Sequence, residues 1–211
     1  MRALLRGLVA AACLFAAPLS AQDIEVDPDL YRVSGVAFND VLNIRQEPTA
    51  ASPIIGALSP DATGVEVIAT ASGWGMVNSG EGHGWVSMRY MTREGDWVKN
   101  HLPKGLSCYG TEPFWNFGFG DTGTAIADWS LMGWGSGPVV YYDVWTGSAQ
   151  NRGQANRGFT LAGDAVDAAG AIRTEYCSDG MSDRAYGFAV DVILKRGADG
   201  MMVSGCCSLS N

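Results

Sequence analysis

The chain has 211 residues, with 14 basic and 22 acidic side chains and a net charge of −8. This acidic balance, without a basic cluster, argues against binding to nucleic acid or to an anionic lipid surface, because both repel negative charge. Gly is abundant, with 28 residues, and no long segment has the spacing of an amphipathic helix. Short strands separated by turn residues therefore predict a mainly β protein.

The first 21 residues have the three parts of a secretory signal peptide. A basic start with Arg2 and Arg6 precedes an apolar run at residues 8–17, and small residues end at Ala21. The run is shorter than the ~20 residues of a membrane-spanning helix, so no transmembrane segment is expected. Lipidation of Cys13 is the alternative, but little apolar sequence precedes it. Cleavage after Ala21 predicts a periplasmic or secreted protein with 12 basic and 22 acidic residues, a net charge of −10.

Residues 40–91 hold five short alternating segments punctuated by Gly and Pro, which predict a small β-barrel. Gly73-Trp74 and Gly84-Trp85 each place a large aromatic ring directly after a flexible residue. Such a ring can offer an apolar face and a polar N–H to a ligand, or it can close the end of a barrel. Trp74 and Trp85 are therefore candidate binding residues, and packing is the alternative role for both.

Four short motifs follow one another in this region: the strand Leu42-Asn43-Ile44-Arg45 with Pro48, the turn Ile55-Gly56-x-Leu58, Gly73-Trp74, and Gly84-Trp85-Val86. In this combination, the region at residues 30–92 resembles the bacterial SH3-like (SH3b) domain family. Members of this family commonly accompany cell-wall enzymes and envelope proteins, and some bind peptidoglycan. The resemblance implies a small barrel, with peptidoglycan or another envelope protein as a partner.

A polar connector follows this region. Charged side chains gather between Thr92 and Gly105, and Pro103 interrupts any regular element there. We expect a linker at residues 93–104 and a second domain at residues 105–211. The two domains are expected to fold independently.

The second half also has the pattern of β-strands. Trp115, Phe117 and Phe119 alternate with small or polar residues, which predicts a strand with one aromatic face. The pattern as a whole predicts an antiparallel meander that curls into a barrel or a strongly bent sheet. Trp134, in a glycine-rich loop, is a third candidate binding residue. Further strands are expected at residues 124–129 and 139–145, around Tyr176, at 188–194 and at 201–207, with polar loops at 148–158 and 178–184.

Four cysteines follow the signal peptide, at positions 108, 177, 206 and 207. An even number in an exported chain predicts two disulfides. A metal site is the alternative, but there is no Cys-x-x-Cys pair, and His83 and His101 lie outside the cysteine-bearing half. No metal or other cofactor is therefore expected. Because neighbours in a strand point to opposite faces, Cys206 and Cys207 are expected to pair with different partners.

Three motifs stand out in this half: Gly110-Thr111-Glu112-Pro113-Phe114-Trp115, Cys177-Ser178-Asp179-Gly180-Met181-Ser182-Asp183, and Gly205-Cys206-Cys207. In this order they resemble an uncharacterised bacterial envelope-protein domain. The resemblance covers about residues 105–210 and implies a periplasmic or lipoprotein β-domain. In relatives with fewer cysteines, the residues matching Cys177 and Cys206 are kept, which implies the pairs Cys177–Cys206 and Cys108–Cys207.

Glu112, Asp179 and Asp183 could provide paired carboxylates for glycoside hydrolysis. Alternatively, the two aspartates hydrogen-bond backbone N–H groups in a turn, and Glu112 holds the entrance of a strand. The chain has no Gly-x-Ser-x-Gly elbow, and neither histidine lies in a nucleophile or metal pattern. The leading hypothesis is an exported, non-enzymatic envelope protein that binds peptidoglycan or a periplasmic partner. The alternatives are a cell-wall hydrolase and a protein resembling lysozyme inhibitors.

Overall fold

The computed structural model describes residues 23–94, 102–103, 105–120, 123–150 and 156–209. The expected signal peptide and most of the expected linker lie outside these residues. The described residues form β-strands and two 3₁₀ turns, η1 (Met88–Tyr90) and η2 (Ser130–Met132), without an α-helix. None of the helical segments described could span a lipid bilayer. The mainly β class predicted from the sequence is confirmed.

The first sheet is antiparallel, with the strand order β3-β2-β6-β5-β4-β1-β7. Its first strand begins at Glu25, ahead of the expected start of the barrel near residue 30. Pro28 lies where the pairing of β1 with β4 shifts register, a bulge that tolerates its missing N–H. The same proline explains why this strand is not predicted from the sequence pattern. The strands are β1 (Glu25–Val33), β2 (Leu42–Arg45), β3 (Ile54–Leu58), β4 (Val65–Ala71), β5 (Trp74–Ser79), β6 (Gly82–Ser87) and β7 (Met91–Arg93).

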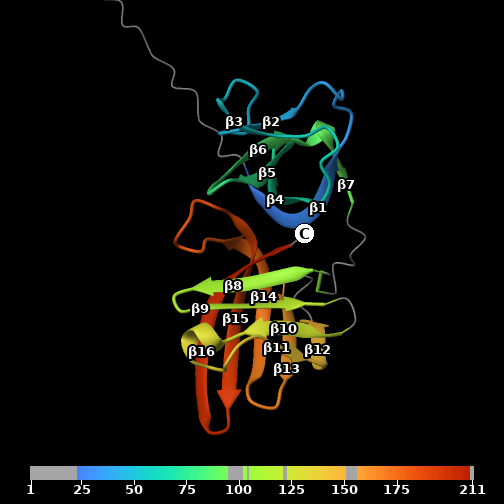
Figure 1. Ribbon diagram of the computed structural model, residues 1–211. Helices are drawn as coiled ribbons and strands as arrows, with labels where there is room; N and C mark the ends of the chain where they lie inside the picture. Colours follow the sequence, from blue (N-terminus) through green and yellow to red (C-terminus); the bar gives the residue numbers. More distant parts are fainter. Residues whose placement is uncertain (1–22, 95–101, 104, 121–122, 151–155, 210–211) are drawn as a thin grey trace, which may run out of the picture.

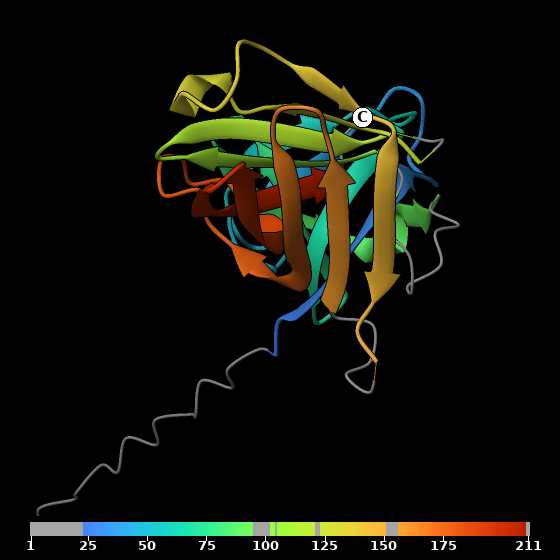
Figure 2. The same cartoon turned by 90° about the horizontal axis from the view of Figure 1, so that it is seen from below.

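The second sheet is also antiparallel and forms a nearly closed barrel, with the order β11-β10-β9-β8-β16-β15-β14-β13-β12. Its two end strands, β11 and β12, are consecutive in the chain, with only Tyr142 between them. β11 pairs with β10 and β12 pairs with β13, so a bend at Tyr142 carries the chain from one end of the sheet to the other (Figure 2). The strands are β8 (Leu106–Thr111), β9 (Phe114–Phe119), β10 (Ala125–Asp128), β11 (Val139–Tyr141), β12 (Asp143–Ser148), β13 (Asn156–Ala162), β14 (Asp167–Cys177), β15 (Tyr186–Arg196) and β16 (Asp199–Leu209).

Aromatic side chains fill the barrel. Trp115, Phe117 and Phe119 point inward from β9 as the alternation predicts, and Phe117 packs on Phe159 with ring centroids 5.1 Å apart. The buried polar group of Trp129 is satisfied, because its Nε1 donates to the hydroxyl of Tyr141 at 3.0 Å. This dense aromatic core holds the barrel in one packing arrangement.

Two strands differ from the sequence-based expectation. The segment expected as one strand at 139–145 is split at Tyr142 into β11 and β12. The polar loop expected at 148–158 is shorter, since β12 runs to Ser148 and β13 begins at Asn156, and residues 151–155 lie outside the described residues. Arg157 takes an inward position in β13, where it is 2% exposed and lies over the ring of Phe188. An inward arginine breaks the alternation by which β13 would be recognised.

The two sheets pack against each other (Figure 1). Leu30 of β1 packs on the barrel core, and Ala185 at the foot of β15 joins the buried cluster around Trp85. Asn78 makes two hydrogen bonds to the backbone of Ala185, at 2.9 and 3.0 Å. The backbone N–H of Leu209 donates to Oε1 of Glu66 at 3.0 Å. The barrel and the first sheet therefore share an interface, and their independent folding stays a prediction.

Candidate functional site

A cleft of about 560 Å³ opens on the first sheet. Strand β2 lines it with Asn43 and Arg45, and η1 adds Arg89 and Tyr90. Trp74 closes one side at the start of β5, directly after two residues with positive φ, Ser72 and Gly73. The N–H of Met88 bonds to the carbonyl of Gly73 at 3.0 Å, which keeps η1 beside this turn.

The cleft combines aromatic and cationic groups. Arg45 is oriented by a 2.7 Å hydrogen bond from Nη1 to the carbonyl of Ser52, and the guanidinium of Arg89 lies 5.8 Å from the ring centroid of Tyr90. With Asp40 as the opposing charge, the lining carries a net positive charge on an acidic chain. The aromatic rings of such a cleft can stack on an apolar or planar group, and its guanidinium groups can attract a carboxylate.

The other two candidate tryptophans lie elsewhere. Trp85 is 5% exposed and belongs to a buried cluster with Ile68 and Met76, so it presents no face to a ligand. Trp134 packs on the barrel core next to η2, and the guanidinium of Arg196 covers its ring at 4.8 Å. Of the three tryptophans, Trp74 alone lines the cleft.

The family comparison places this cleft in a known kind of domain. Residues 40–92, which include most of the residues that line the cleft, match the model of the bacterial SH3 domain. Residues 40–92 are a bacterial SH3 domain. The SH3 domain therefore contains β2 to β7, while β1 lies outside the matched range. Searches of curated proteins and of solved structures found no match for the chain.

A second, smaller pocket of about 270 Å³ brings together the three sequence motifs of the barrel. Glu112 lies in the tight turn between β8 and β9, Asp179 follows β14, and Cys206 lies on β16. The hydroxyl of Thr111 donates to the carbonyl of Asp179 at 2.7 Å, which ties the first motif to the second. Motifs that are far apart in the sequence thus form one site, which we call the barrel pocket.

Asp179 is used as a hydrogen-bond acceptor within its own loop. Its carboxylate accepts the N–H groups of Met181 and Ser182, the hydroxyl of Ser182 and the hydroxyl of Tyr186, all between 2.9 and 3.0 Å. Burial alone raises the pKa of Asp179, but these hydrogen bonds lower it by more, to about 2. A carboxylate held ionised in this way can act as an acceptor but not as a proton donor at neutral pH.

The other two candidate carboxylates differ from Asp179. Glu112 is exposed and lines the same barrel pocket. The backbone N–H of Asp183 donates to the carbonyl of Glu81 in the SH3 domain at 3.0 Å, and its carbonyl lies 2.7 Å from Nδ1 of His83. The structure thus brings Glu112 and Asp179 into one pocket and places Asp183 at the interface with the SH3 domain.

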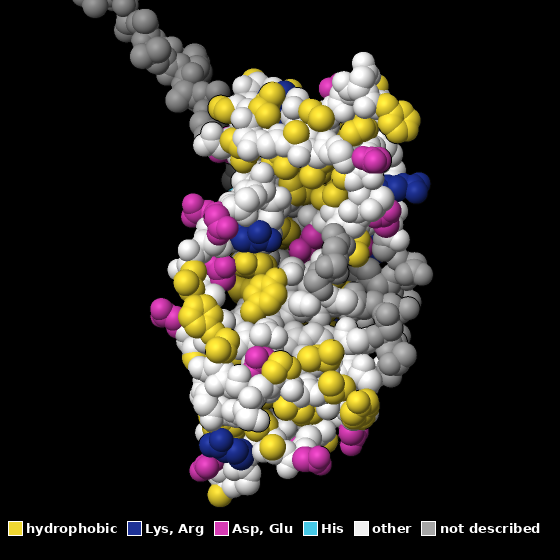
Figure 3. Space-filling view, in the orientation of Figure 1, with side chains coloured by type: hydrophobic (Ala, Val, Ile, Leu, Met, Phe, Trp, Pro, Cys, Tyr) yellow, Lys and Arg dark blue, Asp and Glu magenta, His cyan; other side chains and the backbone are white. Residues whose placement is uncertain are grey.

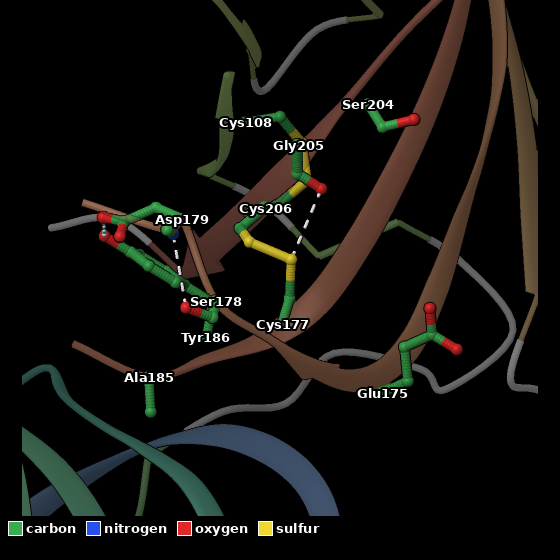
Figure 4. Close-up of a disulfide and its surroundings, with 12 residues drawn as sticks. Cys108, Glu175, Cys177, Ser178, Asp179, Ala185, Tyr186, Ser204, Gly205 and Cys206 are labelled. Carbon is green, nitrogen blue, oxygen red and sulfur yellow. Dashed lines mark hydrogen bonds between the residues drawn. A yellow bond between two sulfur atoms is a disulfide. The ribbon is translucent and has the colours of Figure 1, made fainter. Parts of the chain in front are cut away.

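Two disulfides join the strands of the barrel. Cys108 and Cys207 face each other directly across β8 and β16, and both are fully buried. Cys177 bonds to Cys206, linking the end of β14 to β16 at the wall of the barrel pocket (Figure 4). Sγ of Cys177 also lies 3.5 Å from the carbonyl oxygen of Gly205, a close contact, since a bonded sulfur carries no proton to donate. These are the pairs that the resemblance implies.

Proposed function

We propose that this protein is an exported, non-enzymatic binding protein of the bacterial cell envelope, and that its SH3 domain binds the peptide part of peptidoglycan. The observation that carries the proposal is the cleft, which places Trp74 and Tyr90 beside Arg45 and Arg89. Wall peptides offer an extended backbone with carboxylates. Aromatic faces can stack on such a backbone, and guanidinium groups bind carboxylates.

The hydrolase alternative has less support. It needs one carboxyl group that donates a proton and a second that stays ionised. Asp179 stays ionised, but its oxygens accept four hydrogen bonds within the protein. Glu112 is exposed in a turn at the edge of the barrel pocket and is not enclosed in an apolar site of the kind that surrounds a catalytic acid. The barrel pocket is therefore better described as a structural junction with an accessible surface.

The test is retention of the mature protein on purified peptidoglycan, with a zymogram of the same protein run beside it. We expect Trp74→Ala to weaken retention by about tenfold, the order of one lost aromatic contact, and Arg89→Gln to weaken it in a salt-dependent way. The melting temperature should change little for Arg89→Gln, because its side chain is exposed.

The matched control is Trp145→Ala. Trp145 is 57% exposed on β12, outside the cleft, in the region where hydrophobic side chains gather over β10, β11 and β12 (Figure 3). Retention should be unchanged in this variant. Normal retention of Trp74→Ala combined with loss for Trp145→Ala would move the binding surface to the barrel. A clearing zone in the zymogram that disappears in Glu112→Gln would favour the hydrolase instead.

A further inference from the structure

The two disulfides lie in different surroundings. Cys108 and Cys207 are both 0% exposed and belong to the barrel core, where no reductant can reach the bond without unfolding. Cys177 is partly exposed, and together with Cys206 it lines the barrel pocket. Exposure is one of the properties that separates labile disulfides from structural ones.

The accessible bridge also lies at the root of a loop that holds the SH3 domain. Residues 178–185 follow Cys177 directly and run to the foot of β15, where Ala185 points toward the first sheet (Figure 4). Asp183 bonds to Glu81, Nη1 of Arg184 donates to the carbonyl of Gly80 at 3.1 Å, and Ala185 bonds to Asn78. We call residues 178–185 the docking loop. The disulfide ties its first end to β16 of the barrel.

We propose that the Cys177–Cys206 disulfide is a site of thiol–disulfide exchange with a dithiol, reached through the barrel pocket, and that its opening loosens the docking loop from the SH3 domain. The Cys108–Cys207 bridge has no part in this exchange. Strand geometry keeps the exchangeable bridge apart from the core bridge. The neighbours Cys206 and Cys207 point to opposite faces of β16 and bond to different strands.

The exchange balances in two steps. A thiolate of the dithiol bonds to the sulfur of Cys177, the more exposed of the pair, and Cys206 leaves as a thiolate that takes a proton from solvent. The second thiol of the reductant, once deprotonated, attacks the mixed disulfide. The reductant becomes a disulfide, Cys177 becomes a thiol, and two electrons have passed to the protein. An oxidised dithiol reverses the reaction.

The charge of the barrel pocket favours some thiols over others as they approach the disulfide. Glu112, Asp179 and Asp191 line it against one described cation, Arg173, whose guanidinium bonds to Asp191 at 2.5 Å and to Glu175 at 3.0 Å. The lining is therefore net negative. A cationic thiol should enter more readily than an anionic one at low ionic strength.

The first experiment follows bridge opening in the intact mature protein. The protein is exposed to dithiothreitol under native conditions, free thiols are alkylated at intervals, and peptides are mapped by mass. We expect Cys177 and Cys206 to be alkylated at least about tenfold faster than Cys108 and Cys207. After division by thiolate concentration and by the rate of each thiolate with a small neutral disulfide, cysteamine should react faster than 3-mercaptopropionate. Equal opening of both bridges, or equal corrected rates for the two thiols, would overturn the assignment.

The second experiment measures the rate of amide hydrogen exchange in the docking loop of the selectively reduced protein. Exchange in residues 178–185 and in the facing hairpin 78–83 should accelerate by about tenfold, while the amides paired between β8 and β9 stay protected. The double variant Cys177→Ser with Cys206→Ser should show the same faster exchange without reductant. If that variant does not fold, the selectively reduced natural protein alone tests whether bridge opening releases the loop. Unchanged exchange in the loop would contradict its release by bridge opening.

Discussion

Two tryptophans with the same local sequence have different surroundings. Trp74 and Trp85 both follow a glycine at the start or within a strand of the SH3 domain, yet Trp74 lines the cleft and Trp85 is buried. Both rings contact the cluster that includes Ala185 of the barrel, but Trp85 is one of its buried members, whereas Trp74 packs against it and stays half-buried. The shared Gly-Trp pattern cannot reveal which of the two rings is enclosed.

Asp179 shows how a residue with a catalytic appearance can have a structural role. We expect Asp179→Asn to lower the free energy of unfolding at neutral pH by about 1 kcal/mol, less than the full pKa change implies, because solvent screens a partly exposed carboxylate. An amide nitrogen cannot accept the hydroxyls of Ser182 and Tyr186 that the second carboxylate oxygen accepts.

The contribution of Asp179 to the free energy of unfolding should depend on pH. The folded-state pKa of Asp179, about 2, lies below its ordinary value of 3.8. Its contribution is therefore present above about pH 4 and is lost as the pH falls toward 2. Urea denaturation at several pH values should show this loss in the natural protein and not in Asp179→Asn. Asp183→Asn, with an exposed side chain, serves as the control and should leave stability nearly unchanged.

At the level of elements, the tight pairing of the barrel strands depends on particular glycines. Gly170 lies in the middle of β14, where an added Cβ would meet the carbonyl oxygen of Asp191 and approach the ring of Phe159 to 2.6 Å. Neither the paired backbone nor the buried ring can move away easily. The glycine is therefore required by close packing rather than by a turn.

We expect Gly170→Ala to lower the free energy of unfolding by about 2–3 kcal/mol through overpacking. Gly118→Ala is the matched control from a neighbouring region of the same barrel, because its nearest contact is the hydroxyl of Ser107 at 3.3 Å, which can rotate. Thermal unfolding of both variants compares the two sites. A loss of stability in Gly118→Ala as large as that in Gly170→Ala would argue against this packing explanation.

In the whole molecule, the interface between the two sheets contains a half-buried acid, Glu66. Burial raises the pKa of Glu66 from 4.5 to about 7, although the hydrogen bond from the N–H of Leu209 and the charge of Arg184 lower it in part. In the unfolded chain this carboxyl ionises near 4.5. Ionisation therefore favours the unfolded state as the pH rises.

The stability of the folded protein should therefore change over a defined range of pH. Between about pH 4.5 and 7 the unfolded chain releases the proton of Glu66 and the folded protein keeps it, so stability falls with rising pH and stays low above 7. Glu66→Gln keeps an acceptor for Leu209 and should be about 1–3 kcal/mol more stable than the natural protein at pH 8, but equal to it below pH 4.5. Glu81→Gln, with an exposed side chain, should show no such difference.

The mainly β class, the SH3 resemblance, the inward aromatic face of β9 and the presence of two disulfides could all be predicted from the amino-acid sequence. Each of these rests on a local signal: an alternation with period two, a short motif, or a cysteine count in a chain whose first residues have the pattern of a signal peptide. The alternation failed at Pro28 and at Arg157, where a bulge and an inward cation break the pattern of a strand.

Which residues come into contact could be read only from the folded molecule. It brought Glu112, Asp179 and Cys206 into one pocket, placed Asp183 against the SH3 domain, left Trp74 half-buried at the cleft and buried Trp85. These outcomes depend on pairing between segments far apart in the chain, such as β8 with β16, and on the packing of one sheet against another. Local sequence encodes which face of a strand is apolar, whereas the partner of that face is set by the free energy of the whole packed molecule.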